Sequence, residues 1–250
     1  MEFDVREGER LDDLVRDGMR IIQRPDQFCF SIDSVLLAHF VRVRRKDRIA
    51  DLGTGTGVIP LLLTALGAEH VTGIEKNPVM AELAARNVKG NHKEDKIRIV
   101  EGDYCRPAEL FSSGAFTSIV VNPPYREVGR GALNEKRGVA AACHELTASL
   151  EDVFRAAAYL LAFGGRLTMV HRSDRISDLI TAGRACRMEL KRLRFIHSHE
   201  GEPAARVLGE WKYGGHPGTT VEPPLIVHQK NGGYTEEVLA IYGKEKGTES

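Results

Sequence analysis

Long apolar runs and paired cysteines are both missing from this sequence of 250 residues. No apolar segment approaches the roughly 20 residues that a transmembrane helix needs, and the polar start MEFDVREGERLDD does not read as a signal peptide. The cysteines form no C-x-x-C pair, and the histidines do not fall at the spacing of metal ligands. We therefore expect a cytoplasmic protein with reduced thiols, no membrane span and no metal site; the four cysteines are Cys29, Cys105, Cys143 and Cys186.

An excess of one charge is also absent, because 35 basic residues balance 35 acidic ones. Net charge therefore neither announces nor excludes a nucleic-acid partner, since local basic patches can bind phosphates on a neutral protein. Two segments, Arg126–Arg137 and Arg184–Arg194, are rich in basic residues and are candidates for such contacts. Binding through them would depend strongly on salt concentration.

What the sequence does contain is a regular alternation of short apolar runs with amphipathic segments. The spacing predicts βαβ units, and hence an α/β fold with a doubly wound, mostly parallel sheet. The Gly- and Pro-containing segment 206–243 is expected to add an antiparallel C-terminal edge, giving seven strands in one domain. Strands are expected over 48–52, 71–75, 97–101, 117–121, 166–171 and 190–196, and helices over 31–41, 58–66, 78–87, 150–163 and 176–186.

The first chemical motif is the loop DLGTGTG, which follows the first strand of this pattern and precedes a helix. Its glycines are spaced G-x-G-x-G, whereas the dinucleotide fingerprint is G-x-G-x-x-G and faces a pyrophosphate. A carboxylate, Asp51, stands before the glycines; it would repel a pyrophosphate but suits the ammonium and sulfonium charges of S-adenosylmethionine. The predicted cofactor-binding residues of this loop are Asp51, Gly53, Thr54, Gly55, Thr56 and Gly57.

Acidic residues also stand at the ends of the next two predicted strands. Glu75 ends the second strand, about 20 residues after the glycine loop, where a carboxylate accepts hydrogen bonds from ribose hydroxyls. Asp103 follows the third strand and is placed to accept from the adenine amino group of the cofactor. Both are predicted to bind S-adenosylmethionine.

The second motif is Asn122-Pro123-Pro124-Tyr125, which directly follows the fourth predicted strand. Proline has no N–H, so this loop presents mainly acceptors, namely the Asn122 side-chain oxygen and the Pro123 carbonyl. Two acceptors that hold the hydrogens of a planar amino group, such as adenine N6, make its lone pair available for attack on a methyl group. Tyr125 offers an aromatic face on which an extruded base can stack. All four residues are predicted to be catalytic, with Asn122 also beside the cofactor.

The motifs DLGTGTG, IEKNP, EGD and NPPY together resemble the class I methyltransferases that act on amino groups. The segments QFCFSIDSVLLAHF and GGHPGTTVEPPLIVHQKNGGYTEEV, and the stretch after NPPY, resemble the bacterial tRNA1(Val) (adenine-N6)-methyltransferase family. The similarity runs from about Arg20 to Gly243. It implies a seven-stranded Rossmann-like fold, in which residues 1–45 lead into a catalytic core over 46–250. It also implies that Phe30–Asp33 cover the cofactor, and that the substrate is a purine beside the anticodon of a valine tRNA.

Other functions remain open from the residues alone. Glutamine-N5 methylation of a release factor needs the same acceptor loop, but that family carries a sizeable helical domain before its glycine loop. Another RNA or DNA amino-methyltransferase would also carry NPPY. A non-catalytic RNA-binding module that keeps the fold is a further alternative, against which Asn122 and Tyr125 argue. A nicotinamide oxidoreductase is disfavoured by Asp51 and by the glycine spacing.

Overall fold

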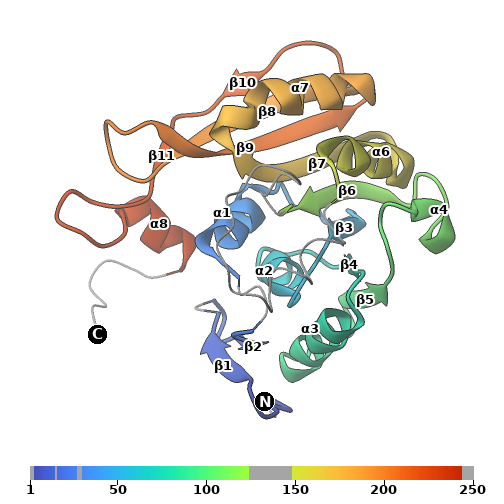
Figure 1. The fold of residues 1–250 in the computed structure, drawn as a ribbon, viewed down its shortest axis with the longest axis vertical. Coiled ribbons are helices and arrows are strands. Elements are labelled where there is room, and N and C mark those ends of the chain that lie inside the picture. Colours follow the sequence, from blue (N-terminus) through green and yellow to red (C-terminus); the bar gives the residue numbers. More distant parts are fainter. Residues whose placement is uncertain (1–2, 15, 27–29, 124–147, 244–250) are drawn as a thin grey trace, which may run out of the picture.

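A single large sheet organises the chain, as the computed structural model shows for residues 3–14, 16–26, 30–123 and 148–243. The strands follow the order β10-β8-β9-β7-β6-β3-β4-β5, and β11 pairs with β8 (Figure 1). The strands are β3 (Ile49–Leu52), β4 (Val71–Glu75), β5 (Ile97–Glu101), β6 (Phe116–Val121), β7 (Leu161–Arg172), β8 (Met188–His197), β9 (Ala204–Tyr213), β10 (Thr220–Val221) and β11 (Leu225–Ile226). The helices are α1 (Ile32–Phe40), α2 (Val58–Ala65), α3 (Pro78–Gly90), α4 (Pro107–Leu110), α6 (Leu150–Leu160), α7 (Ile176–Ala185) and α8 (Glu236–Ile241), and a short 3-10 turn covers Ser173–Arg175.

The predicted doubly wound, mostly parallel α/β architecture is confirmed. Strands β3, β4, β5, β6 and β7 pair in parallel, while β9 runs antiparallel between β7 and β8. The sheet has nine strands among the described residues rather than seven, because β10 and β11 add two short parallel pairings to β8. The antiparallel strand therefore lies near the edge of the sheet and not at its last position.

Both faces of the sheet are covered, as the alternation of side chains on β6 illustrates. Val120 belongs to a core with α1, α2 and α8, whereas Ile119 and Val121 belong to a second core with α6 and α7. Successive residues of a strand point to opposite faces, so an unbroken apolar strand fills two cores at once. This burial fixes the register of β6, and with it the position of the loop that follows Val121.

Side-chain caps begin three of the described helices, α3, α6 and α8. Asn77 caps α3 by accepting from the amides of Val79 and Met80, and Pro78 occupies the first turn, where its missing N–H costs nothing. Ser149 and Asp152 form a reciprocal capping box at the start of α6. The prediction that this helix continues to 163 was wrong, because residues from Leu161 onward pair with β6 as part of β7.

A small N-terminal hairpin was not predicted. Residues 1–30 were expected to be irregular, but β1 (Arg10–Asp13) and β2 (Arg20–Gln23) pair antiparallel. The hairpin lies against α3, apart from the large sheet (Figure 1). The division of the chain into a lead-in and a catalytic core stays a prediction.

Candidate active site

The carboxyl ends of four neighbouring strands meet at one edge of the sheet. Leu52 at the end of β3 pairs with Ile74 on β4 and with Val121 on β6, and Glu75 pairs with Glu101 on β5. The loops after these strands therefore lie at the same edge, where ligands of open α/β sheets bind. The predicted site residues that the structure describes lie in these loops or in the last residues of the strands before them: Asp51, Gly53, Thr54, Gly55, Thr56, Gly57, Glu75, Asp103, Asn122 and Pro123.

The glycine loop turns sharply from β3 into α2. Gly53, Gly55 and Gly57 have φ angles of 72°, 56° and 81°, which glycine adopts without the strain that a side chain would add. The Gly53 amide donates to the Ile74 carbonyl at 2.9 Å, which holds the start of the loop on β4. A Cβ on Gly57 would lie 3.4 Å from the Cβ of Ala84 on α3, so the loop also packs closely on that helix. The loop is thus shaped by its backbone, as the sequence predicted.

Asp51 is a buried acid beneath this loop. It is fully inaccessible, and neither carboxylate oxygen has a hydrogen-bond partner of normal geometry among the described residues. The pKa of Asp51 is raised to about 7, chiefly by burial; the nearby Thr54 hydroxyl opposes this rise, and the charge of Glu75 adds to it. An unpaired buried carboxyl group is costly to the fold. Its position at the ligand edge makes it a candidate partner for a positively charged ligand group.

Glu75, in contrast, is anchored by backbone amides. Its Oε2 accepts from the Gly55 amide at 2.8 Å, and its Oε1 accepts from the Asn77 amide at 2.9 Å. A carboxylate has about four acceptor positions, so these two bonds fix its orientation and still leave capacity for the two hydroxyls of a ribose. The geometry is compatible with the predicted role of Glu75 in cofactor binding.

Asp103 is held by two neighbours at the end of β5. Its Oδ2 lies 2.9 Å from the Lys76 Nζ, and its Oδ1 accepts from the Cys105 amide at 2.9 Å. Burial opposes ionisation, but these donors together lower the pKa of Asp103 below its usual value. Asp103 is therefore ionised at neutral pH, and an incoming amino group would share this acceptor with Lys76. The adjacent Tyr104 ring approaches Gly53, a contact that was not predicted.

Asn122 directly follows β6, and its side chain is oriented by helix α1. The Asn122 Nδ2 donates to the Oγ of Ser34 at 3.1 Å, and Ser34 is itself buried. Because a carboxamide is planar, its oxygen then points away from Ser34. Figure 1 shows β6 ending beside α1, and Pro123 is buried at that point. Pro124 and Tyr125 lie outside the described residues.

Ser34 was not predicted as part of the site. It lies within the segment FSIDS, close to the residues that were expected to cover the cofactor, which is the only local signal for it. Of those residues, Phe30 donates its amide to the Gln23 Oε1 at 3.0 Å, and Asp33 pairs with Arg206 at 3.1 Å. The covering role of Phe30–Asp33 stays a prediction.

The basic segment Arg184–Arg194 makes internal contacts that weaken its interpretation as a phosphate-binding patch. Arg184 pairs with Glu189, and Arg192 is buried against Glu210. Arg194 pairs with Glu237. The segment also begins at the amino end of β8, opposite to the edge that holds Asn122. The other basic segment, 126–137, lies outside the described residues.

No group of three or more His, Cys, Asp or Glu side chains placed to hold a metal ion occurs among the described residues. None of the described helices combines the length and apolar character needed to cross a membrane. Cys105 and Cys186 are free thiols, while Cys29 and Cys143 lie outside the described residues.

The sequence matches a known protein family and several named relatives. The model of the methyltransferase small domain matches residues 19–180. The tRNA1(Val) (adenine(37)-N6)-methyltransferase of Porphyromonas gingivalis strain ATCC 33277 is 32% identical over 200 residues, which cover 76% of each chain. Several further relatives with the same name come from other bacteria.

Solved structures agree on the fold. A predicted O-methyltransferase from Agrobacterium tumefaciens has 27% sequence identity and a TM-score of 0.66, covering 84% of this chain and 95% of its own. The geranyl diphosphate C-methyltransferase of Streptomyces coelicolor, solved with S-adenosyl-L-homocysteine, has a TM-score of 0.53 at 14% identity and supports the fold alone; it covers 73% of this chain and 78% of its own. The mostly parallel sheet, the glycine loop at its carboxyl edge and the sequence span matched by the family model all indicate the same family. The chain therefore belongs to the methyltransferase small-domain family and, within it, to the bacterial tRNA1(Val) (adenine-N6)-methyltransferases.

Proposed function

We propose that this protein transfers a methyl group from S-adenosylmethionine to the exocyclic N6 of an adenine in tRNA, in the cytoplasm. The adenine beside the anticodon of a valine tRNA is the proposed target. The observation that carries the proposal is the placement of Asn122 at the same sheet edge as the glycine loop, with its amide nitrogen bonded to Ser34. Curated relatives with the name of this activity support it along most of the chain.

The cofactor fits the residues at this edge. The unpaired oxygens of Asp51 would accept the ammonium group, and the anchored Glu75 would accept from the ribose hydroxyls. Asp103 would accept from the adenine amino group of the cofactor. When bound, S-adenosylmethionine supplies an electrophilic methyl group on a sulfonium. The glycine loop allows close approach of the ligand to the backbone.

The acceptor loop would prepare the nitrogen of the target base. The Asn122 Oδ1 and the Pro123 carbonyl would accept the two N6 hydrogens, which favours a pyramidal nitrogen with an available lone pair. Ser34 orients Asn122, because its hydroxyl accepts from the amide nitrogen and the carboxamide oxygen therefore points away from Ser34. Holding the nitrogen in line with the methyl group lowers the barrier by proximity. The nitrogen held by Asn122 and Pro123 would accept the methyl group that bound S-adenosylmethionine supplies; the methyl carbon–sulfur bond would break, and the methylated nitrogen would release a proton to water.

Glutamine-N5 methylation of a protein is the alternative with the same chemistry. The described residues before the glycine loop form a short hairpin and helix α1. The curated relatives are also named for tRNA. Adenine in tRNA is therefore the better-supported acceptor.

The test uses an unmodified valine tRNA transcript and S-adenosylmethionine labelled on its methyl group. After digestion, we expect the label in N6-methyladenosine, and we expect Asn122→Ala to lower kcat by about 10²–10³-fold. Ser118→Ala is the matched control, since Ser118 is buried on the same strand away from the loop and its Oγ has no hydrogen-bond partner among the described residues; it should keep full activity. Label recovered in protein glutamine, or full activity of Asn122→Ala, would overturn the proposal.

A further inference from the structure

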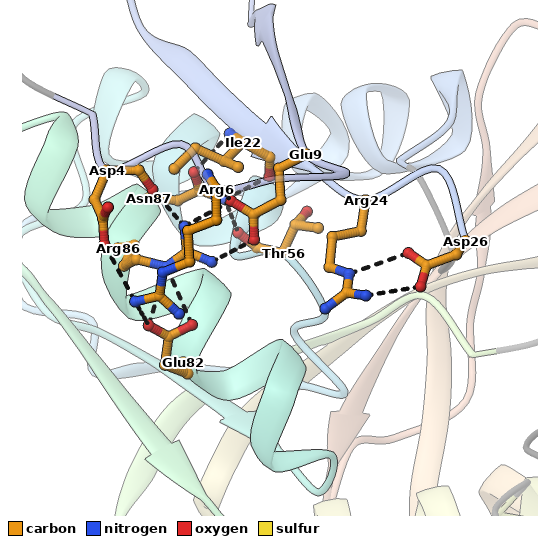
Figure 2. Close-up of polar contacts among 10 residues, drawn as sticks. All are labelled: Asp4, Arg6, Glu9, Ile22, Arg24, Asp26, Thr56, Glu82, Arg86 and Asn87. Carbon is orange, nitrogen blue, oxygen red and sulfur yellow. Dashed lines mark hydrogen bonds and ion pairs between the residues drawn. The ribbon is translucent and has the colours of Figure 1, made fainter.

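We propose that Asn87 is a positioning residue, which fastens the glycine loop to the N-terminal hairpin and so sets the affinity for S-adenosylmethionine. Asn87 lies on α3 and is completely buried. Its Nδ2 donates to the Thr56 carbonyl at 2.9 Å and to the Ile22 carbonyl at 3.0 Å, and its Oδ1 accepts from the Ile22 amide at 2.6 Å. Figure 2 shows this side chain between the two backbone segments. The inference rests on the proposed use of the cofactor.

The three hydrogen bonds employ both N–H groups of the carboxamide. One of them reaches Thr56, which stands between Gly55 and Gly57 in the glycine loop. Glu75 holds the same loop from the other side through the Gly55 amide. The loop is therefore fixed at adjacent residues by two side chains, one from β4 and one from α3. Glycines leave a loop free to rearrange, so these two bonds limit the conformations that the cofactor must select.

The hairpin side of the contact resembles the pairing of two strands. Asn87 bonds both backbone groups of Ile22, and Asn91 does the same to Arg20, whose amide donates to Oδ1 at 3.0 Å and whose carbonyl accepts from Nδ2 at 2.7 Å. Residues two apart on a strand present their backbone groups on the same edge, and residues four apart on a helix lie on the same face. Asn87 on α3 and Asn91, the C-cap residue of this helix, thus satisfy the edge of β2.

Asn87 and Asn91 differ in their remaining contact. The second N–H of Asn91 goes to the Asn87 carbonyl of its own helix at 2.8 Å, whereas that of Asn87 goes to the glycine loop. Both side chains therefore stabilise the hairpin, but only one connects it to the cofactor site. The pair provides its own internal control.

Ion pairs secure the hairpin on α3. Arg86 pairs with Glu9 at 2.6 Å, both being largely buried, and with Glu82 at 3.0 Å. It also donates to the Asp4 carbonyl (Figure 2). The contacts to Glu9 and Asp4 hold the segment before β1 on α3, whereas Glu82 belongs to α3 itself; none of these residues lies in the glycine loop. Loss of the Asn87–Thr56 bond should therefore act on the loop even while the hairpin stays in place.

Further hydrogen bonds connect the hairpin, through α1, with the loop that contains Asn122. Gln23, the last residue of β2, accepts from the Phe30 amide, and α1 follows with Ser34 bonded to Asn122. One set of contacts thus connects the loop for the methyl donor with the loop for the methyl acceptor. A residue that only filled space at Asn87 would not make this connection.

The decisive comparison is between Asn87→Ala and Asn91→Ala in the full chain. We expect both variants to lower the unfolding temperature, because each loses contacts to β2. Only Asn87→Ala should weaken S-adenosylhomocysteine binding in calorimetry and raise KM for S-adenosylmethionine, by about tenfold in each case. Its kcat at saturating cofactor should change by less than about threefold, since the reacting groups are untouched. Equal losses of affinity in both variants, or an unchanged affinity in Asn87→Ala, would overturn the proposal.

A second measurement needs no variant and covers the case in which Asn87→Ala does not fold. Amide hydrogen exchange of the wild-type protein is followed with and without S-adenosylhomocysteine. We expect the ligand to slow exchange at the Ile22 amide as well as in the glycine loop, because Asn87 joins the two. Protection confined to the glycine loop would contradict the inference. Absence of any binding to the wild-type protein would instead contradict the proposed function, so the two failures are distinguishable.

Discussion

The cofactor half of the sheet, β3 to β5, and the antiparallel half, β7 to β9, bury charge in different ways. On β8, Arg192 pairs with Glu222 at 2.7 Å and with Glu210 at 3.2 Å, and its guanidinium lies 4.0 Å from the centre of the Phe40 ring. On β3, Asp51 is equally buried but has no hydrogen-bond partner of normal geometry in the described residues. The buried charges of Arg192 and its partners thus stabilise the fold, whereas the carboxyl group of Asp51 lies where a ligand is expected to bind.

The largest expected effect is a loss of stability when Arg192, in the antiparallel half of the sheet, is replaced. Arg192→Met should lower the free energy of unfolding by about 3–5 kcal/mol, because it leaves Glu210 buried without its main partner. Urea denaturation measures this change, and S-adenosylhomocysteine affinity should stay within about twofold. The double variant Arg192→Met with Glu210→Gln should recover much of the loss. A loss below about 1 kcal/mol in the single variant would mean that the ion pairs of Arg192 contribute little to the stability of the antiparallel half.

The buried carboxyl group of Asp51 should make the stability of the protein depend on pH. The folded-state pKa of Asp51 is raised to about 7, so the unfolded chain releases this proton at lower pH than the folded protein. The free energy of unfolding should therefore fall as pH rises, by about 1.4 kcal/mol per pH unit between about pH 5 and 6.5 from this group, and level off above about pH 7. Asp51→Asn should lack this contribution, as chemical denaturation at several pH values would show.

The ionisation of Asp51 should also make ligand affinity depend on pH. An ammonium group favours the ionised form of Asp51, so S-adenosylhomocysteine affinity should increase as pH rises through about 7 in the wild-type protein. In Asp51→Asn the pH dependence should be absent and the affinity lower. Identical pH profiles for the two proteins would mean that the unpaired carboxyl group does not face the ligand.

The smallest expected effect concerns Glu75, whose partners are backbone amides. Glu75→Gln turns an NH₂ group toward either the Gly55 or the Asn77 amide, and should weaken S-adenosylhomocysteine binding by about tenfold with a stability loss of about 1 kcal/mol. Glu101→Gln is the matched control, because Glu101 pairs with Glu75 in register on β5 and is exposed. If the two substitutions weaken binding equally in calorimetry, the loss in Glu75→Gln comes from the change of charge at this edge and not from the hydrogen bonds of Glu75.

The fold could be predicted where local pattern and burial agree. The ends of β4 and β5 match the expected ranges, because apolar residues there are bounded by turns and polar residues. The end of α6 did not match, since Leu161 and Ala162 continue an apolar run that suits a helix equally well. The hairpin was missed because β2 is four residues long and its partners on α3 lie far along the chain.

The candidate site followed the same rule. The location of Glu75 and Asn122 at the carboxyl edge could be predicted because each directly follows or ends a strand, so their position along the chain gives their position in space; their roles stay predictions. Ser34 and Asn87 could not, since their contacts join residues 88 and 65 positions apart in the sequence. Such contacts depend on how helices pack against the sheet, and no local pattern reports it.

The asparagine contacts on α3 have a consequence for comparing relatives of this chain. A relative could keep DLGTGTG and NPPY unchanged and yet lack a counterpart of β2. The carboxamide at the position of Asn87 would then lose two of its three bonds, and the Thr56 carbonyl would be held by a side chain with no second anchor. Methyl-donor affinity in such proteins should follow the presence of a hairpin that neither signature contains.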